Sequence, residues 1–434
     1  MKIIHAADIH LDSPMLGLER YEGAPVDVLR GATRRAFSKL IDLCLEEQAS
    51  LLLLAGDLFD GDWRDYGTGL FFLTELGRLA GAGRMSRAAA RFAQQSQPFH
   101  PIHVAMLRGN HDAQSVLTKQ LILPDHVQEL PSTSAGSLIF PELGVAVHGQ
   151  GFAERAVNRD LTPEYPAPVP GLFNIGLLHT CLDDRPGHAN YAPSTTQALI
   201  HHGYDYWALG HIHTREVVSR EPWIVYPGNL QGRHMRECGP KGATLIQVEA
   251  GRVQSVEHRE LCVVRWEKLE FDASELEHPE ELLVMVGDRL SQLQAELARP
   301  IAARITIVGR SSLHAVLSAD PERWLAEMRR VASDVGDVWL ERLDIATSAR
   351  IELAELRTLG GPMGQLARSL EALRQNPGEL SELCQELAEL ERRIPRELRE
   401  GPDALLLTDP TAAAHELGAI EQLLLPLLFD AERG

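Results

Sequence analysis

The sequence predicts an α/β protein with two layered central β-sheets flanked by helices, followed by a small α+β domain and a helical C-terminal region. The N-terminal part alternates short apolar runs with amphipathic segments and then continues mainly as apolar strands. The C-terminal part is rich in Glu and Leu at helical spacing. Because 434 residues exceed what one core usually supports, we expect three regions, at 1–265, 266–358 and 365–434.

The first region begins with alternating strands and helices. Short apolar runs predict buried strands over 2–8, 51–56 and 103–107, and apolar positions three and four apart predict helices over 36–48 and 69–81. Later apolar runs predict strands over 137–140, 145–149, 172–179, 204–210, 223–228, 243–249 and 262–266. An early α/β part followed by a mostly β part is typical of two layered sheets rather than one all-parallel sheet.

The pattern changes after residue 265. Strands are predicted over 300–309 and 337–345, with a helix over 321–334 between them, which indicates a small α+β domain. The segment GGPMG, at 360–364, is a predicted break. The remaining segments rich in Glu and Leu predict helices over 366–375, 379–394 and 415–429.

The composition is ordinary for a soluble globular protein, with 44% hydrophobic and 24% charged residues. Asp8 and His10 stand where a signal peptide would need an apolar core. No apolar run approaches the roughly 18 residues of a membrane span. The five cysteines are scattered without a CxxC pair, which fits reduced thiols rather than a disulfide framework or a zinc site. We therefore expect a cytoplasmic protein that does not associate with membranes.

The net charge of −19 is unevenly distributed. Residues 266–434 hold 18 Lys and Arg against 32 Asp and Glu, a net of −14, which leaves −5 for residues 1–265. Part of that −5 comes from clustered carboxylates that metal ions can neutralise. The charge therefore neither requires nor excludes a polyanionic substrate. A basic insertion at 83–100 is interpreted as a solvated surface segment in preference to a nucleic-acid contact.

Five polar blocks stand at the ends of predicted N-terminal strands. Each alone has an ordinary explanation, because Gly-Asp and Gly-Asn pairs favour turns and a single His is more often a hydrogen-bonded residue than a ligand. Together they place metal-binding side chains at every strand exit. The blocks are Asp8 with His10; Asp57; Asn110 with His111 and Asp112; His179; and His211 with His213.

The spacing of these blocks suggests convergence on one site. Asp8 and His10 are two residues apart, as are His211 and His213, so on a strand each pair faces one side. Strand ends of α/β folds meet at a crevice where ligands usually bind. Carboxylates, imidazoles and an amide without a thiolate suit Mn²⁺, Fe²⁺ or Mg²⁺ better than a sulfur-rich zinc site. Seven such ligands are too many for one ion and predict two divalent ions.

In this order, D-x-H, G-D, G-N-H-D, H and G-H-x-H resemble the signature of the calcineurin-like metallophosphoesterases over residues 1–215. The fold implied is the layered calcineurin-like phosphoesterase fold. Within that family, IHAADIHLDSPM, GDLFDGDWRDY, GHIHT and YPGNLQGR resemble the bacterial DNA-repair exonucleases of the SbcD and YhaO type. The resemblance is weaker over the last 170 or so residues.

The resemblance implies a role for each residue. One metal ion, with Mn²⁺ as the first choice, would be held by Asp8, His10 and His213. A second would be held by Asn110, His179 and His211, with Asp57 bridging both ions. His111 would face the scissile phosphate as a general acid or hydrogen-bond donor. Asp112 would orient the His111 ring.

One residue departs from the pattern of related nucleases. In many of them the block after G-D-L-F ends in His, whereas here it ends in Asp60. Asp60 either stands near the phosphate, leaving one imidazole fewer, or turns away and caps the next segment.

Substrate contacts are less strongly indicated. Trp63 and Arg64, with Tyr66, lie on a predicted loop and could stack on a base and hold a phosphate, or Trp63 could pack on the adjoining helix. Arg233 and His234 could touch the substrate backbone or be surface residues.

The function implied is a two-metal phosphodiesterase acting on DNA, an exonuclease or endonuclease in DNA repair. Its implied partner is a coiled-coil SMC-like ATPase docked on the helices after residue 365, with a second copy of the chain as a further partner. Those helices could equally pack back on this chain. The alternatives are a small-molecule phosphodiesterase or phosphatase, and a non-catalytic scaffold subunit that binds DNA ends.

Overall fold

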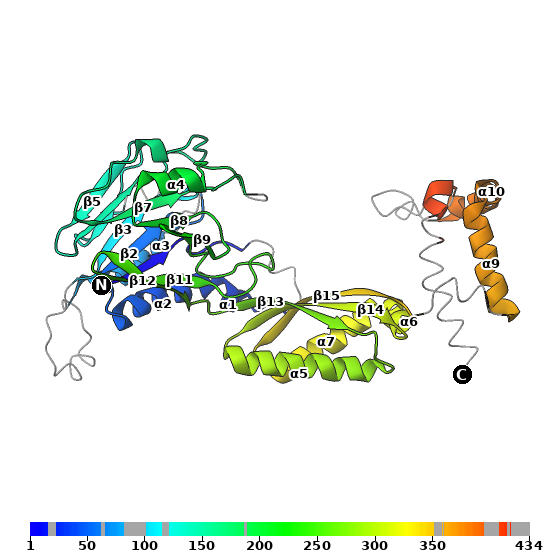
Figure 1. Ribbon diagram of the computed structural model, residues 1–434. Coiled ribbons are helices and arrows are strands. Elements are labelled where there is room, and N and C mark those ends of the chain that lie inside the picture. The colour runs from blue at the N-terminus through cyan, green and yellow to red at the C-terminus, as the bar shows by residue number, and fades with distance from the viewer. Residues whose placement is uncertain are drawn as a thin grey trace. The chain divides into compact units, whose positions relative to one another are not determined.

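The computed structural model in Figure 1 describes residues 1–15, 23–61, 66–81, 101–114, 121–185, 189–350, 358, 360–394, 408–414 and 417. The chain divides into two compact units, Met1–Glu267 with Arg299–Ala302 and Lys268–Ala298 with Ala303–Gly434. The predicted insertion at 83–100, Trp63, Arg64 and nearly all of the helix predicted at 415–429 lie outside the described residues.

The first sheet has six strands in the order β12-β11-β1-β2-β3-β4. The strands β1, β2, β3 and β4 run parallel, while β11 is antiparallel to β1 and β12 to β11. Their bounds are β1 Lys2–Ala6, β2 Leu51–Ala55, β3 His103–Leu107, β4 Val127–Glu129, β11 Gly242–Glu249 and β12 Arg252–Glu260. The parallel strands all point their carboxyl ends to the same edge.

The second sheet also has six strands, in the order β5-β6-β7-β8-β10-β9. Its central strands β6, β7, β8 and β10 are parallel, and the two outer strands are antiparallel to their neighbours. The bounds are β5 Gly136–Phe140, β6 Val145–Gly149, β7 Phe173–His179, β8 Tyr206–Gly210, β9 Glu216–Arg220 and β10 Trp223–Tyr226. The predicted α/β architecture, with two layered mixed sheets flanked by helices, is confirmed.

Three buried clusters hold the two sheets and their helices together. Side chains such as Leu53 of the first sheet and Ile175 of the second fill the space between the sheets. Phe37 and Phe72 bring helices onto the outer face of the first sheet, and Leu199 packs a helix on Trp207 of the second. These helices are α1 Val26–Arg30, α2 Ala32–Glu46, α3 Tyr66–Gly77 and α4 Thr196–His202, with short 3₁₀ turns at Arg78–Ala80, Asp112–Gln114 and Thr162–Glu164.

The second unit contains a three-stranded sheet in the order β13-β14-β15. Buried side chains of its helices, including Val286, Trp324 and Met328, give this unit a core of its own. The bounds are β13 Arg265–Asp272, α5 Pro279–Leu297, β14 Ile301–Ser311, α6 His314–Ala319, α7 Pro321–Val335 and β15 Val338–Ala349.

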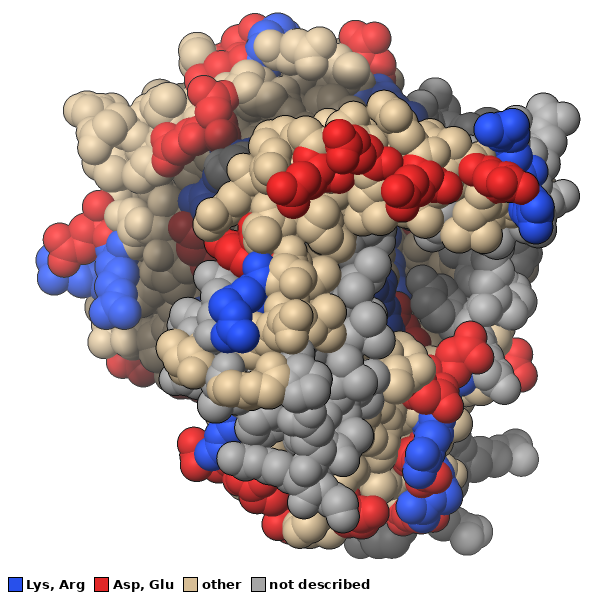
Figure 2. Space-filling view, turned by 90° about the vertical axis from the view of Figure 1, so that its right-hand side faces the viewer, with Lys and Arg blue, Asp and Glu red and all other residues tan. Residues whose placement is uncertain are grey.

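The C-terminal helices α9 (Gly361–Gln375) and α10 (Pro377–Arg393) share a small apolar cluster. Its buried members are Leu380, Cys384 and Leu417. The opposite side of α10 exposes glutamates at 379, 382, 386 and 389. On the face drawn in Figure 2, acidic side chains form a row and Lys and Arg lie in separate small groups. The glutamates at 379, 382, 386 and 389 of α10 are therefore presented to solvent.

Some predicted elements differ from those observed. The strand predicted over 262–266 is wrong in its first three residues, because Leu261 and Cys262 donate their N–H groups to Lys241 O and β13 starts only at Arg265. The break predicted over 360–364 is also wrong in part, since α9 begins at Gly361. The strands β4, β9 and β12 and the helices α1, α4, α5 and α6 were not predicted. Among the described helices, none combines the length and apolar character needed to cross a membrane.

We predict that His5 makes stability depend on pH. His5 is fully buried, with Nδ1 3.1 Å from Tyr206 Oη and Nε2 3.0 Å from Leu209 O, and burial lowers its pKa to about 3. Its pKa in the unfolded chain is about 6.5, so below that pH only the unfolded chain takes up the proton. Lowering the pH from about 7.5 to about 5.5 is expected to cost the wild type about 1.4 kcal/mol more unfolding free energy than His5→Asn.

The measurement is urea unfolding of both proteins at the two pH values in the presence of a chelator. Other titrating groups are common to both proteins and cancel in the comparison. Equal losses of stability in the wild type and in His5→Asn would contradict the assignment.

Candidate metal centre

Five strands from the two sheets deliver polar side chains to one edge of the first unit. Asp8 follows β1, Asp57 follows β2, and Asn110 follows β3 after a short turn. His179 is the last residue of β7, and His211 directly follows β8. The carboxyl ends of these parallel strands meet where α/β folds usually bind ligands.

The backbone at this edge is bent into the left-handed region at four of the residues. The φ angles are 51° at Asp8, 44° at His10, 50° at Asp57 and 97° at His211. Such conformations are costly for residues other than Gly and concentrate at functional sites. Strand alternation therefore does not place the D-x-H and H-x-H pairs, as the sequence analysis assumed, because both pairs lie beyond their strands. His211 and His213 join different groups, which is the division that the resemblance implied.

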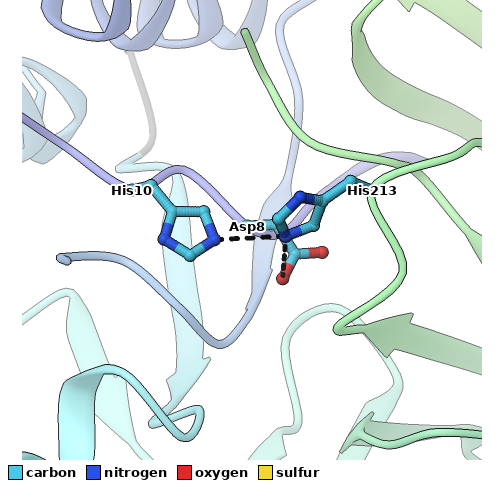
Figure 3. A group of neighbouring side chains, drawn as sticks. All are labelled: Asp8, His10 and His213. Carbon is cyan, nitrogen blue, oxygen red and sulfur yellow. Dashed lines mark hydrogen bonds and ion pairs between the residues drawn. The ribbon is translucent and has the colours of Figure 1, made fainter. Parts of the chain in front are cut away.

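The first group consists of Asp8, His10 and His213. Figure 3 shows the rings of His10 and His213 turned toward each other beside the Asp8 carboxylate. The two Nε2 atoms are 3.2 Å apart, and His213 Nε2 is 4.0 Å from Asp8 Oδ1. Both oxygens of Asp8 also accept the backbone N–H of His211 at 3.0 Å. This hydrogen bond ties the loop after β8 to the loop after β1.

The second group consists of Asp57, His179 and His211, with Asn110 beside them. His179 Nε2 is 3.0 Å from Asn110 Oδ1 and 3.4 Å from Asp57 Oδ2. The rings of His179 and His211 have their centroids 5.2 Å apart. Asp57 Oδ2 is also 3.9 Å from His10 Nε2. Asp57 therefore stands between the two groups, where the sequence analysis placed a bridging ligand.

Three of the imidazoles donate their remote ring nitrogen to a fixed acceptor. His179 Nδ1 is 2.9 Å from Ala55 O, His211 Nε2 is 2.8 Å from Ala189 O, and His213 Nδ1 is 2.7 Å from Glu237 Oε1. In a neutral ring the opposite nitrogen is thereby left with its lone pair. This is the arrangement that orients histidine ligands in metal sites.

Burial and the neighbouring charges together determine the protonation of the groups in the site. Burial lowers the pKa of His10 to about 3, with Arg233 adding to the effect, and it lowers the pKa of His211 to about 3. Burial alone would raise the pKa of Asp57, but His179 and His10 hold that pKa well below its usual range. Burial is likewise outweighed at His179, where the Asp57 carboxylate raises the pKa to about 9. The carboxylate of Asp57 is therefore ionised and stabilises a positive charge next to it.

A divalent cation fits these residues. The Nε2 atoms of His10 and His213, which hydrogen-bond to each other at 3.2 Å, can both turn their lone pairs to a cation instead, and the buried Asp8 and Asp57 carboxylates need compensating charge. A cation supplies that charge, and these donors contain no thiolate. The two groups share Asp57 and are compatible with a dinuclear divalent metal site.

Two glycines of the motifs allow the strand ends to approach so closely. A Cβ at Gly210 would clash with the carbonyl oxygen of Ala55, and one at Gly56 would lie 2.6 Å from His179 Nδ1. Gly56 also has a φ of 88°, which L side chains rarely adopt. The Gly-Asp and Gly-His pairs therefore have a packing reason beyond the turn chemistry that they also suit.

His111 lies beside the two groups with its side chain one-third exposed (33%). Its Nδ1 is 2.9 Å from Asp60 Oδ1, and Asp60 Oδ2 accepts a hydrogen bond from Ser13 Oγ at 2.6 Å. Asp60 thus points into the site, which decides between the two interpretations of this residue. It stands near the predicted phosphate position and next to His111.

Asp112 occupies a different place from the one predicted. Its carboxylate is buried and accepts the backbone N–H groups of Leu58, Phe59 and Gly109 at 3.1, 2.9 and 3.0 Å. These bonds join the loop after β2 to the loop after β3. The carboxylate that meets His111 Nδ1 is that of Asp60, so we correct the orienting role from Asp112 to Asp60. Asp112 instead fixes the two loops that deliver Asp57 and Asn110.

The structure describes some of the predicted substrate contacts and not others. Trp63 and Arg64 lie outside the described residues, and Tyr66, the first residue of α3, is largely exposed. Arg233 is mostly buried, with Nη2 2.9 Å from Glu237 Oε1 and Nη1 3.7 Å from Asp60 Oδ2. His234 is exposed.

Glu237 is a site residue that the sequence analysis missed. It is buried and binds both His213 and Arg233. No local pattern marks it, because it lies in an irregular loop between β10 and β11 among residues of mixed polarity. Its proximity to His213 follows from tertiary structure alone.

The geometry agrees with comparisons to known proteins. The calcineurin-like phosphoesterase family matches residues 1–215, which contain every residue of the two groups. The chain is also 32% identical over 390 residues to the metallophosphoesterase YhaO of Bacillus subtilis (strain 168), covering 87% of this chain and 91% of YhaO. The chain belongs to the calcineurin-like metallophosphoesterase family.

Two further matches extend this assignment. The middle domain of metallophosphoesterase YhaO matches residues 266–348, which hold most of the second unit's sheet and helices. The DNA double-strand break repair protein Mre11 of Methanopyrus kandleri is 26% identical over 308 residues, covering 62% of this chain and 61% of that protein. The predicted family and its YhaO-like branch are confirmed.

We predict opposite effects for Asp60→Asn and Asp112→Asn. Asp60→Asn removes the charge beside His111 and is expected to lower kcat about 10–100-fold, with little change in stability. Asp112→Asn leaves one oxygen for three backbone donors and is expected to cost about 1–3 kcal/mol of unfolding free energy. The measurements are phosphodiester hydrolysis with saturating Mn²⁺ and urea unfolding in chelator. A loss of kcat in Asp112→Asn with unchanged stability would return the orienting role to Asp112.

Proposed function

We propose that this metallophosphoesterase uses two divalent metal ions to hydrolyse phosphodiester bonds of DNA, and that it acts in DNA repair. Mn²⁺ is the proposed metal, with Fe²⁺ or Mg²⁺ as the alternatives. The observation that carries the proposal is the convergence of two ligand groups on Asp57, with the Asp60–His111 pair beside them. The first group is Asp8, His10 and His213, and the second is Asn110, His179 and His211 with the shared Asp57.

Each part of this arrangement has a chemical task. Two bound divalent cations would neutralise the phosphate oxygens and lower the pKa of an attacking water. His111, held at Nδ1 by Asp60, presents its Nε2 side to the phosphate and donates a hydrogen bond or a proton to the leaving oxygen. The attacking water would give one proton to solvent as its oxygen bonds to phosphorus and the bond from phosphorus to the sugar oxygen breaks. The sugar oxygen would leave with the proton of His111, which would then take another from solvent.

DNA is proposed as the substrate because of the similarity to an Mre11 protein named for double-strand break repair. The net charge of −19 means that attraction of a polyanion depends on the metal ions and on local basic groups rather than on the chain as a whole.

The partner is proposed to be an SMC-like coiled-coil ATPase that docks on the C-terminal helices. Support comes from α10, whose exposed surface includes Leu390 (52% exposed) as well as its glutamates. A second copy of the chain is proposed as a further partner. Sedimentation that gives a monomer at micromolar concentration would remove the homodimer.

The proposal predicts Mn²⁺-dependent shortening of end-labelled linear DNA, duplex or single-stranded, with parallel cleavage of bis(p-nitrophenyl) phosphate. A chelator is expected to abolish both activities. His111→Ala is expected to lower them by about 10²–10⁴-fold, because the donor to the leaving oxygen is lost. His201→Ala, an exposed histidine on α4, is the matched control and is expected to leave both unchanged.

The outcomes separate the proposed function from its alternatives. Cleavage of the small diester alone would contradict DNA as the substrate of the isolated chain and favour a small-molecule phosphodiesterase. Absence of both activities in a protein that binds two Mn²⁺ ions would contradict catalysis and favour the DNA-end-binding scaffold.

A further inference from the structure

Beside the metal centre, Glu237 and Arg233 form a hydrogen-bonded network, of which the sequence motifs include only Arg233. Both residues lie in the loop between β10 and β11, and Arg233 also lies close to Asp60. We propose that Glu237 and Arg233 are positioning residues, which hold His213 and Asp60 in their working orientations, and that Arg233 does not contact the substrate. This inference rests on the proposed function, because it assigns roles within the same site.

Hydrogen bonds within its own loop hold the Glu237 side chain in place beside His213. Its Oε2 accepts the backbone N–H of Arg233 at 2.8 Å and Asn229 Nδ2 at 3.0 Å. Its backbone N–H donates to His234 O at 2.8 Å. A buried carboxylate needs such partners to be stable. These contacts leave Oε1 directed at the metal centre.

Oε1 of Glu237 determines which nitrogen of His213 is available. It lies 2.7 Å from Nδ1, so that nitrogen carries the proton and donates it to the carboxylate. The lone pair is then at Nε2, which faces His10 and Asp8. His213 O accepts a hydrogen bond from Lys241 Nζ at 2.6 Å. Both the ring and the backbone of His213 are thus held from outside the site.

His213 differs in this respect from His179 and His211. Those two rings donate to the backbone carbonyls of Ala55 and Ala189, whereas His213 donates to a carboxylate. A carboxylate makes the imidazole a stronger ligand than a carbonyl does. The affinity of the first group for its metal ion therefore depends on Glu237, a side chain that contacts a ligand and not the ion itself.

Arg233 extends the same network to the catalytic pair. Its Nη2 donates to Glu237 Oε1 at 2.9 Å, and its Nη1 lies 3.7 Å from Asp60 Oδ2. Asp60 in turn meets His111 at 2.9 Å. The guanidinium is engaged by two carboxylates and its side chain is only 14% exposed, so it is directed inward. It connects the orientation of His213 with that of His111.

The test measures Mn²⁺ binding by the full-length chain, with calorimetry as the method. Glu237→Gln is expected to bind two Mn²⁺ ions, with one site weakened about 10–100-fold. Arg236→Lys, in the same loop and exposed, is the control and is expected to bind as the wild type does. Equal affinities in Glu237→Gln and the wild type would overturn the role of Glu237. Should Glu237→Gln fail to fold, Glu237→Asp removes the reach to His213 and carries the same expectation.

A double-mutant cycle distinguishes positioning from a general structural effect. If Glu237 acts through His213, adding Glu237→Gln to His213→Gln causes no further loss of Mn²⁺ affinity. Full additivity of the two losses would overturn the proposal. These binding measurements do not require catalysis. A wild type that binds two Mn²⁺ ions but cleaves no diester would therefore contradict the proposed function and leave the roles of Glu237 and His213 in metal binding standing. A wild type that binds fewer than two ions would overturn the inference as well.

Arg233→Lys tests the second residue by kinetics with bis(p-nitrophenyl) phosphate at saturating Mn²⁺. Lysine keeps the charge but cannot bind two carboxylates in a fork. A positioning role predicts a kcat lower by on the order of tenfold with unchanged KM. A raised KM with unchanged kcat would identify Arg233 as a substrate contact.

Discussion

The carboxylate of Asp57 is the group on which the rest of the site depends. It is almost fully buried, and it lies within 3.9 Å of His10 and 3.4 Å of His179, which belong to different ligand groups. A buried charge of this kind is unfavourable unless cations or donors surround it. The converging strand ends, the left-handed residues and the motif glycines all place such donors around it.

The loops around this carboxylate are fixed by backbone hydrogen bonds rather than by packing alone. Asp8 binds the N–H of His211, and Asp112 binds three N–H groups of the loops that carry Asp57 and Asn110. Buried carboxylates thus serve two purposes here, since some face the metal centre and others hold the loops. Among the ligand groups and the Asp60–His111 pair, His111 and His213 have the most exposed side chains, at 33% and 23%.

Much of the fold and of the ligand set could be predicted from the sequence. Fully apolar strands such as Leu51–Ala55 are unambiguous, and metal-binding side chains directly after them mark the sheet edge. The geometry of Asp8 and His10 could not be predicted, because left-handed backbone replaces strand alternation there. The resemblance gave the orienting role beside His111 to Asp112, whereas the carboxylate at His111 Nδ1 is that of Asp60, which arrives from another loop. Glu237 was missed because only tertiary contacts bring it to His213.

The most direct test of the central claim is anomalous X-ray diffraction from crystals of the full-length chain grown with Mn²⁺. The account predicts two anomalous peaks about 3.5–4 Å apart, one on each side of the Asp57 carboxylate. One peak is expected beside Asp8, His10 and His213, and the other beside Asn110, His179 and His211. A single peak, or none within coordination distance of Asp57, would contradict it.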